Sequence, residues 1–325
     1  MENKYIDKEK EVANQERIIA KKKWPCMCPH CTGTAINSHL LQQHGILDIV
    51  AENGHLYEMR FEDFFKWHTN DPMKVKRIGI QQAISFPLFC NKHDTELFAP
   101  IECNSIDFDD YTSQLLFSYR GLCSEIRKKQ FVQIRSEIWP DCALKEESES
   151  GTNAGIKDLE YFKYLFEDEL STPRHKFTFL HISYPFMPIY ASGTVSFEPV
   201  DYDNQRSINE AIKKKVWDGF FINIIPQNNS LEIIIGYHNN HVNKDLRKYV
   251  ESWKGLSTEQ FQVKLTDLFT ARLETWGMSP SLYASFSDEK KEWFMETQKK
   301  IHLDFSYDIR KELKENLFAD YNVNF

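Results

Sequence analysis

Two short stretches of the sequence carry paired soft ligands for a metal ion. Cys28 and Cys31 are separated by two residues, and the same spacing separates Cys90 from His93. At this spacing a tight turn can direct both side chains of a pair toward one tetrahedral zinc ion. We therefore predict that the two pairs are the two halves of one zinc site. Three neighbouring side chains could each replace one of these ligands: Cys26, His30 and His39.

A histidine between the two pairs is a second candidate for chemistry. The short segment Ile36–His39 follows the first pair and ends in His39. This order of a CxxC pair, a histidine and a CxxH pair resembles the zinc-bound HNH (His-Me finger) nucleases over residues 24–102. The resemblance implies a ββα-metal, treble-clef-like module in which Cys28, Cys31, Cys90 and His93 hold a structural zinc ion. It also implies that His39 is the general base that activates a water molecule.

Three positions differ from the pattern of that family. Ser38 precedes His39 where an acidic residue is usual, Ser85–Pro87 lies where an asparagine is usual, and Asp94 replaces the last catalytic histidine. Carboxylate oxygens are good ligands for Mg²⁺ and Mn²⁺, so the resemblance makes Asp94 the candidate ligand of a catalytic ion. The segments INSH, ENGH and FCxxHD are also similar to those of a group of uncharacterised bacterial proteins.

Composition and cysteine usage indicate the class of protein that carries these residues. A chain of 325 residues with 41% hydrophobic residues can bury a core and is not intrinsically disordered. It has no apolar run of about 18 residues, so we expect no membrane-spanning segment. Seven cysteines, three of them crowded into residues 26–31, favour a metal site in the reducing cytoplasm over a disulfide framework.

The charge of the chain limits how it could contact nucleic acid. A net charge of -8 argues against a surface that is basic throughout, so contacts with phosphates must be local. Two basic clusters are the candidates for such contacts: Lys21, Lys22 and Lys23 before the first ligand pair, and Lys74, Lys76 and Arg77 in the insert between the pairs.

The pattern of apolar residues predicts an α+β protein in several parts. A charged arm over residues 1–23 precedes the zinc-binding module and its helix over 24–142, an acidic linker over 143–158, and an α+β domain over 159–325. The last domain should contain an antiparallel sheet with helices packed on it. Its four predicted strands are Phe177–Ser183, Ile189–Phe197, Val216–Ile225 and Leu231–Tyr237.

Helix signals complete this outline. Apolar residues recur with a helical period from Asp109 to Val132, and Ser257–Gln260 is a capping-box pattern that opens a helix with an apolar face. Ser287 is suited to cap a helix that continues to about Ile301. A last helix is expected over Asp308–Phe318.

These observations support two functional hypotheses of different classes. The resemblance implies a zinc-stabilised, metal-dependent endonuclease that acts on DNA or RNA, with a structural Zn²⁺ ion and a catalytic Mg²⁺ or Mn²⁺ ion; nucleases of this type serve in defence against phage. The second hypothesis is a non-catalytic zinc module that recognises nucleic acid or a protein partner. The sequence contains no P-loop, no GxSxG elbow and no HExxH motif, so it offers no support for a P-loop nucleotide hydrolase, a serine hydrolase or a zincin protease.

Overall fold

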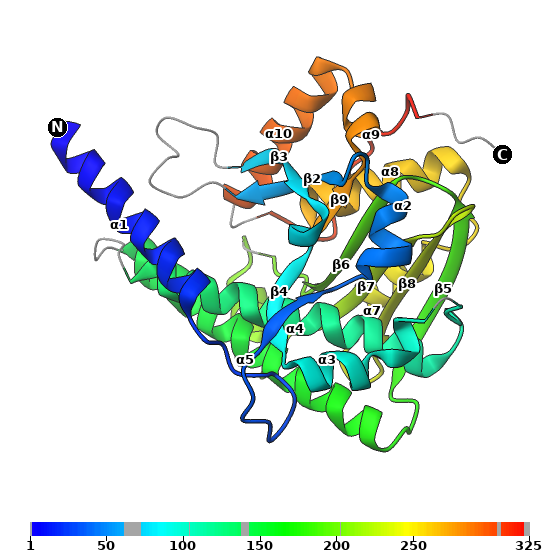
Figure 1. The fold of residues 1–325 in the computed structure, drawn as a ribbon, viewed down its shortest axis with the longest axis horizontal. Helices are drawn as coiled ribbons and strands as arrows, with labels where there is room; N and C mark the ends of the chain where they lie inside the picture. The colour runs from blue at the N-terminus through cyan, green and yellow to red at the C-terminus, as the bar shows by residue number, and fades with distance from the viewer. Residues whose placement is uncertain are drawn as a thin grey trace.

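A seven-stranded antiparallel sheet forms the centre of the protein (Figure 1). The structure is a computed structural model that describes residues 2–61, 73–103, 105–137, 143–201, 203–303 and 307–321. The strand order across the sheet is β3-β2-β9-β6-β7-β8-β5. In chain order the strands are β2 (His55–Phe61), β3 (Met73–Gly79), β5 (Phe177–Pro185), β6 (Ile189–Ser196), β7 (Gly219–Pro226), β8 (Ser230–His238) and β9 (Trp276–Met278).

The predicted antiparallel sheet of the C-terminal half is confirmed by β5, β6, β7 and β8. Every residue of β7 is buried, because helices cover both faces of this part of the sheet. Its side chains alternate between two core clusters, with Phe221 and Ile225 on one face and Phe220, Ile222 and Ile224 on the other. This is why its sequence is apolar apart from the buried Asn223 and shows no regular polar alternation.

Two long helices, α4 (Tyr111–Ser136) and α5 (Ala143–Ser171), lie side by side on one face (Figure 1). Helix α4 confirms the predicted helix, and it begins where the Asp110 side chain accepts a hydrogen bond from the Ser113 amide at 2.8 Å. Most of α4 is buried, since it packs against both α5 and the sheet.

The structure differs from the predicted linker at 143–158, because these residues lie within α5. The Glu, Ala and Lys residues that looked like a solvated linker are also good helix formers. Ile156, Leu159 and Phe162 are buried along one side of α5, which therefore has a core-facing stripe that the acidic surface residues obscure in the sequence.

Helices cover the opposite face of the sheet as well. The capping box of α8 (Thr258–Ala271) is confirmed, with Ser257 and Gln260 bonded to each other's backbone amides. Residues 307–321 contain no helix, so the predicted last helix is wrong; Leu317 and Phe318 are instead buried as parts of an irregular segment. The other helices of the C-terminal half are α6 (Gln205–Lys213), α7 (Lys244–Glu251), α9 (Pro280–Ser285) and α10 (Asp288–Leu303), the last of which covers the helix predicted after Ser287.

The two halves of the chain share the seven-stranded sheet. Strand β9 lies between β2 and β6, pairing Tyr57 with Met278 and Ile189 with Met278. The insert between the two ligand pairs thus supplies β2 and β3, and these strands extend a sheet whose other strands come from the C-terminal half. The predicted boundary between the zinc module and the α+β domain therefore divides the strands of one continuous sheet between two domains.

The ligand-bearing segments form a smaller unit beside this sheet. Strands β1 (Ile36–His39) and β4 (Ser85–Phe89) form a two-stranded antiparallel sheet, and α3 (Asn91–Leu97) follows β4 directly. Helix α1 (Glu2–Lys21) projects from the body, and its end packs through Ile19 against α4 (Figure 1). Short helical turns fill the connections: η1 (Gln43–Leu47), α2 (Asp48–Val50), η3 (Ile80–Gln82) and η4 (Ala99–Ile101). No described helix is long and apolar enough to cross a membrane.

A histidine at the sheet edge leads to a prediction about pH and stability. His181 on β5 bonds Glu232 at 2.7 Å and Asp109 at 2.9 Å, and the bond to Glu232 is the main reason that the pKa of His181 is raised from 6.5. Its charged form therefore contributes stability below pH 6.5, and this contribution is lost as pH rises through the folded-state pKa. We expect His181→Gln to remove this pH-dependent contribution, of order 1 kcal/mol or less. Urea unfolding of both proteins, at pH values below and above 6.5, would measure how the free energy of unfolding depends on pH. The same change in this free energy between the two pH values in both proteins would contradict the prediction.

Candidate metal centre

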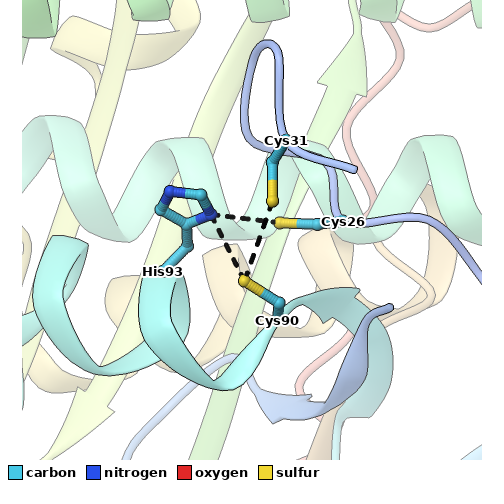
Figure 2. Close-up of side chains that lie close together, drawn as sticks. All are labelled: Cys26, Cys31, Cys90 and His93. Atoms are coloured by element: carbon cyan, nitrogen blue, oxygen red, sulfur yellow. Dashed lines mark hydrogen bonds between the residues drawn. The ribbon is translucent and has the colours of Figure 1, made fainter. Parts of the chain in front are cut away.

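Four side chains from two distant segments converge beside α3 (Figure 2). The ligand atoms of Cys26, Cys31, Cys90 and His93 all lie within 4.8 Å of one another. The His93 Nδ1 atom is 3.4 Å from the sulfur of Cys26 and 3.4 Å from that of Cys90. The sulfurs of Cys31 and Cys90 are 3.9 Å apart. Three thiols and one imidazole at this separation form a donor set that can hold a metal ion.

The N-terminal half of the site is a loop fixed by backbone hydrogen bonds. The Cys26 amide donates to the Gly33 carbonyl at 2.9 Å, and the Met27 amide donates to the Leu88 carbonyl of β4 at 2.9 Å. A turn closes between the Cys28 carbonyl and the Cys31 amide at 3.3 Å, with His30 in the left-handed region at φ 60°. These bonds hold the loop against β4, so that its thiols face the start of α3.

The C-terminal half of the site is the first turn of α3. Cys90 is the N-cap residue of this helix, and the Asp94 amide bonds the Cys90 carbonyl at 2.9 Å. Cys90 and His93 are three residues apart, so their side chains lie on the same side of the helix. The predicted CxxH pair is therefore brought together by an ordinary helix start.

The structure differs from the predicted ligand set at one position, because Cys26 joins the group in place of Cys28. The pKa of the Cys28 thiol is raised by burial and then by the negative charge of Glu167, a residue of α5. The pKa of the Cys28 thiol is thus influenced by α5, next to the loop. The Cys28 carbonyl accepts the hydrogen bond that closes the turn. His30 and His39, which the sequence also offers as replacement ligands, lie outside the group as well.

The arrangement fits zinc. Three thiolates and one imidazole form one of the common tetrahedral ligand sets of structural zinc sites. Burial raises the pKa of Cys26 to about 11, whereas a hydrogen bond from the His93 backbone lowers the pKa of Cys90. The Gly33 amide donates to the Cys31 sulfur at 3.3 Å, a contact that helps to fix this ligand in place. Because Cys26 must lose its proton to bind, zinc uptake by this site should release protons.

Gly33 has no side chain because the metal centre leaves no room for one. A Cβ atom at this position would lie 3.1 Å from the Cys90 Cβ and 3.3 Å from the Cys31 sulfur. We expect Gly33→Ala to push these ligands apart and weaken zinc binding by roughly tenfold or more. Competition with a chromophoric zinc chelator would measure the change. Gly79→Ala is the control, because a Cβ there meets nothing within 4 Å, and equal zinc affinity in both variants would contradict the prediction.

The two predicted catalytic residues belong to the same small unit. His39 is the last residue of β1 and lies opposite Ser85 of β4, and its Nε2 atom is buried without a hydrogen-bond partner among the described residues. Burial lowers the pKa of His39 from 6.5, and the nearby charge of Arg120 lowers it further, while Glu102 and Asp94 oppose the shift. The imidazole is therefore neutral near pH 7 and can accept a proton.

Asp94 lies on α3 and is held by a buried arginine. The Arg120 Nη2 atom of α4 is 3.6 Å from an Asp94 oxygen, and its Nη1 atom is 2.5 Å from an oxygen of Glu102. The guanidinium group also lies over the Phe98 ring, 4.0 Å from its centroid. Asp94 and Glu102 thus share one cation, and the charge of that cation also acts on the pKa of His39.

Sequence reasoning missed Arg120 and Glu102. Arg120 interrupts an apolar run of α4, in Leu115–Cys123, yet its side chain is only 2% exposed. A charged residue on the buried side of a helix usually pairs with an opposite charge, and this was the available signal. Nothing local in the sequence indicated that its partners would be Asp94 and Glu102.

Comparisons of the chain with protein-family models, with curated proteins and with solved structures find no match.

Proposed function

We propose that this protein is a zinc-stabilised, HNH-like endonuclease that cleaves DNA or RNA with a divalent metal ion. The observation that carries the proposal is that Asp94 and Glu102 share Arg120 next to a Cys₃His metal centre, with charges that also act on the pKa of His39. The arrangement of strands supports the proposal further. Strand β1 ends in His39 and pairs with β4, and β4 is followed directly by α3. This order of strand, strand and helix is what the resemblance to HNH nucleases implies.

The proposed chemistry divides the work among these residues. Neutral His39 accepts the proton of a water molecule as that water attacks a phosphodiester. Asp94 and Glu102 would hold Mg²⁺ or Mn²⁺, which stabilises the negative charge on the leaving oxygen. Arg120 holds both carboxylates in position. The zinc ion has no part in the reaction and fixes the loop against α3.

Phosphate contacts would be local, since the chain carries a net charge of -8. Lys21, Lys22 and Lys23 are exposed directly before the metal-binding loop, and the Lys22 ammonium lies 4.4 Å from the centre of the Trp24 ring. The other predicted cluster, Lys74, Lys76 and Arg77, lies on β3 at the edge of the large sheet. We propose the first cluster as the nucleic-acid contact, because it adjoins the metal-binding loop.

A specific observation favours the second candidate, a non-catalytic zinc module that binds nucleic acid or a protein partner. Asp94 and Glu102 already pair with Arg120, so both carboxylates have a partner without any divalent ion. In this second candidate function the Arg120 group is purely structural, and the zinc loop with its three exposed lysines is the binding element.

The deciding experiment is a cleavage assay with the purified chain. Linear and supercoiled DNA and single-stranded RNA are incubated with Mg²⁺, with Mn²⁺ or with EDTA, using protein of known zinc content. The nuclease proposal expects cleavage that needs the added ion and is lost in Asp94→Asn. Asp48→Asn is the control, because Asp48 is a surface carboxylate that pairs with the exposed His44. Binding of nucleic acid without cleavage under all conditions would leave the second candidate as the function.

A further inference from the structure

A large cavity lies at one end of the seven-stranded sheet. Its volume is about 1010 Å³, and it is enclosed by α4, α5, the end of β6, the segment from α6 to β7 and the residues after α8. It shares no residue with the metal centre or with the group around Arg120. This volume is at the upper end of the range for small-molecule sites, so the cavity can accept a ligand of substantial size.

Charged side chains of both signs line the cavity. The basic residues are Lys128, Lys129, Lys157, Lys214, Lys215 and Arg272, and the acidic ones are Glu125, Asp158, Asp218 and Glu274. Two carboxylates outside the lining pair with two of these basic residues, Glu198 with Lys214 and Asp267 with Arg272, each at 2.6 Å. The charges at the cavity therefore balance, and an anion would depend on the basic groups that have no carboxylate partner.

Half of these basic residues are neutralised within the protein. Lys128 pairs with Glu125 at 2.8 Å, Lys214 with Asp218 at 3.0 Å, and Arg272 with Asp267 at 2.6 Å. In the part of the chain that the structure describes, Lys129, Lys157 and Lys215 form no ion pair. These three ammonium groups could contact an external anion, which at Lys129 would add to the weaker influence of the Glu125 and Asp158 carboxylates.

Lys129 is partly buried and is accommodated by a glycine of the facing helix. A Cβ atom at Gly155 of α5 would lie 2.9 Å from the Lys129 Cε and 3.0 Å from its Nζ. The Lys129 ammonium group thus lies against Gly155 of α5 in the wall of the cavity.

Two further groups in the lining could contact a polar or planar part of a ligand in addition to its phosphates. The Thr194 hydroxyl is buried and has no hydrogen-bond partner among the described residues. Trp217 also lines the cavity, and its indole N–H already donates to the Ala211 carbonyl at 3.2 Å. With its polar atom satisfied, the ring is suited to stacking on a planar base.

We propose that this cavity binds a nucleoside polyphosphate. Lysine ammonium groups bind phosphate oxygens as point charges, and three of them match a chain of several phosphates. The Trp217 ring would contact the base and the Thr194 hydroxyl a polar atom of the nucleoside. The cavity would thus be a ligand site, lined by residues of both halves of the chain, that is separate from the proposed nuclease site.

Titration calorimetry on the full chain tests this proposal, with EDTA-free buffer lacking Mg²⁺ so that the proposed nuclease site does not contribute. The probes are ATP, inorganic tripolyphosphate and adenosine. We expect one ATP per chain, weaker binding of tripolyphosphate, and a loss of about tenfold or more in ATP affinity for Lys129→Met with Lys215→Met. Methionine keeps an unbranched apolar stem and removes the charge.

Two controls make the result decisive. Lys248→Met removes an exposed lysine of α7 that does not line the cavity and should leave ATP affinity unchanged. Trp217→Leu should weaken ATP more than tripolyphosphate, with thermal unfolding used to confirm that the variant is folded. Absence of ATP binding at millimolar concentration, equal affinity in the double lysine variant, or tripolyphosphate binding as tight as that of ATP would each overturn the proposal.

Discussion

Replacing Cys90 with serine is expected to release one equivalent of zinc per chain and to lower the free energy of unfolding by roughly 3–5 kcal/mol. A zinc ion would connect the loop at Cys26–Cys31 to the first turn of α3, a link additional to the bond from the Met27 amide to the Leu88 carbonyl of β4. Isolated zinc-finger peptides gain roughly 10–16 kcal/mol from the metal. We expect less here because the two large core clusters remain intact. Elemental analysis and urea unfolding measure the two effects.

A matched pair of variants tests which cysteines are ligands. Cys26→Ser should lose zinc as Cys90→Ser does, because Cys26 belongs to the converging group. Cys28→Ser should keep its zinc, since the Cys28 thiol lies outside that group. Retention of zinc by Cys26→Ser with loss by Cys28→Ser would reverse the assignment, and no zinc in the unaltered protein would remove the metal centre altogether.

The sequence predicted this metal centre only in part, and the reason is geometric. Spacing predicted that Cys90 and His93 would lie together, because a helix start is a local structure, and this pair and Cys28/Cys31 were predicted to form the two halves of one site. The choice between Cys26 and Cys28 depends on how the loop is fixed to Gly33 and Leu88, and these contacts are set by the tertiary fold. A cluster of three cysteines within one loop therefore identifies a site more surely than it identifies the ligands.

The sheet shows the same limit on a larger scale. β7 and β8 were predictable because each is a buried apolar run bounded by turn residues. β9 was not, because a three-residue strand has no periodic signal and exists through its pairs with β2 and β6. That short strand joins the insert to the C-terminal half, whereas the sequence pattern predicted a domain boundary between them at the acidic segment 143–158.

The interior charges explain why the rest of the candidate site was missing from the sequence analysis. Arg120 lies within the helix predicted from Asp109 to Val132, and most of that helix is buried in the structure. Its role depends on Asp94 of α3 and Glu102 of the following segment, which reach it only in the folded protein. The same holds for Glu58, a buried carboxylate that accepts hydrogen bonds from Tyr190 and from the Ile84 amide across the chain.

His39→Ala is expected to lower the rate of metal-dependent cleavage by about 10²–10⁴-fold while zinc content and stability persist. His39 lies outside the zinc ligand group, and its Nε2 atom has no hydrogen-bond partner among the described residues, so the substitution should remove a base and little structure. Its pKa is lowered from 6.5, mainly by burial. The cleavage rate of the unaltered protein should therefore decline only when pH falls below 6.5.

His44→Ala is the control for this prediction, because His44 is an exposed residue that pairs with Asp48 on the surface. The measurement is single-turnover cleavage of a labelled DNA or RNA, with zinc content determined on the same samples. Cleavage at the normal rate in His39→Ala would remove His39 as the base and leave the group around Arg120 with a structural role. Loss of zinc in His39→Ala would instead make His39 a support of the metal centre, and the difference between these outcomes separates the nuclease from the non-catalytic zinc module.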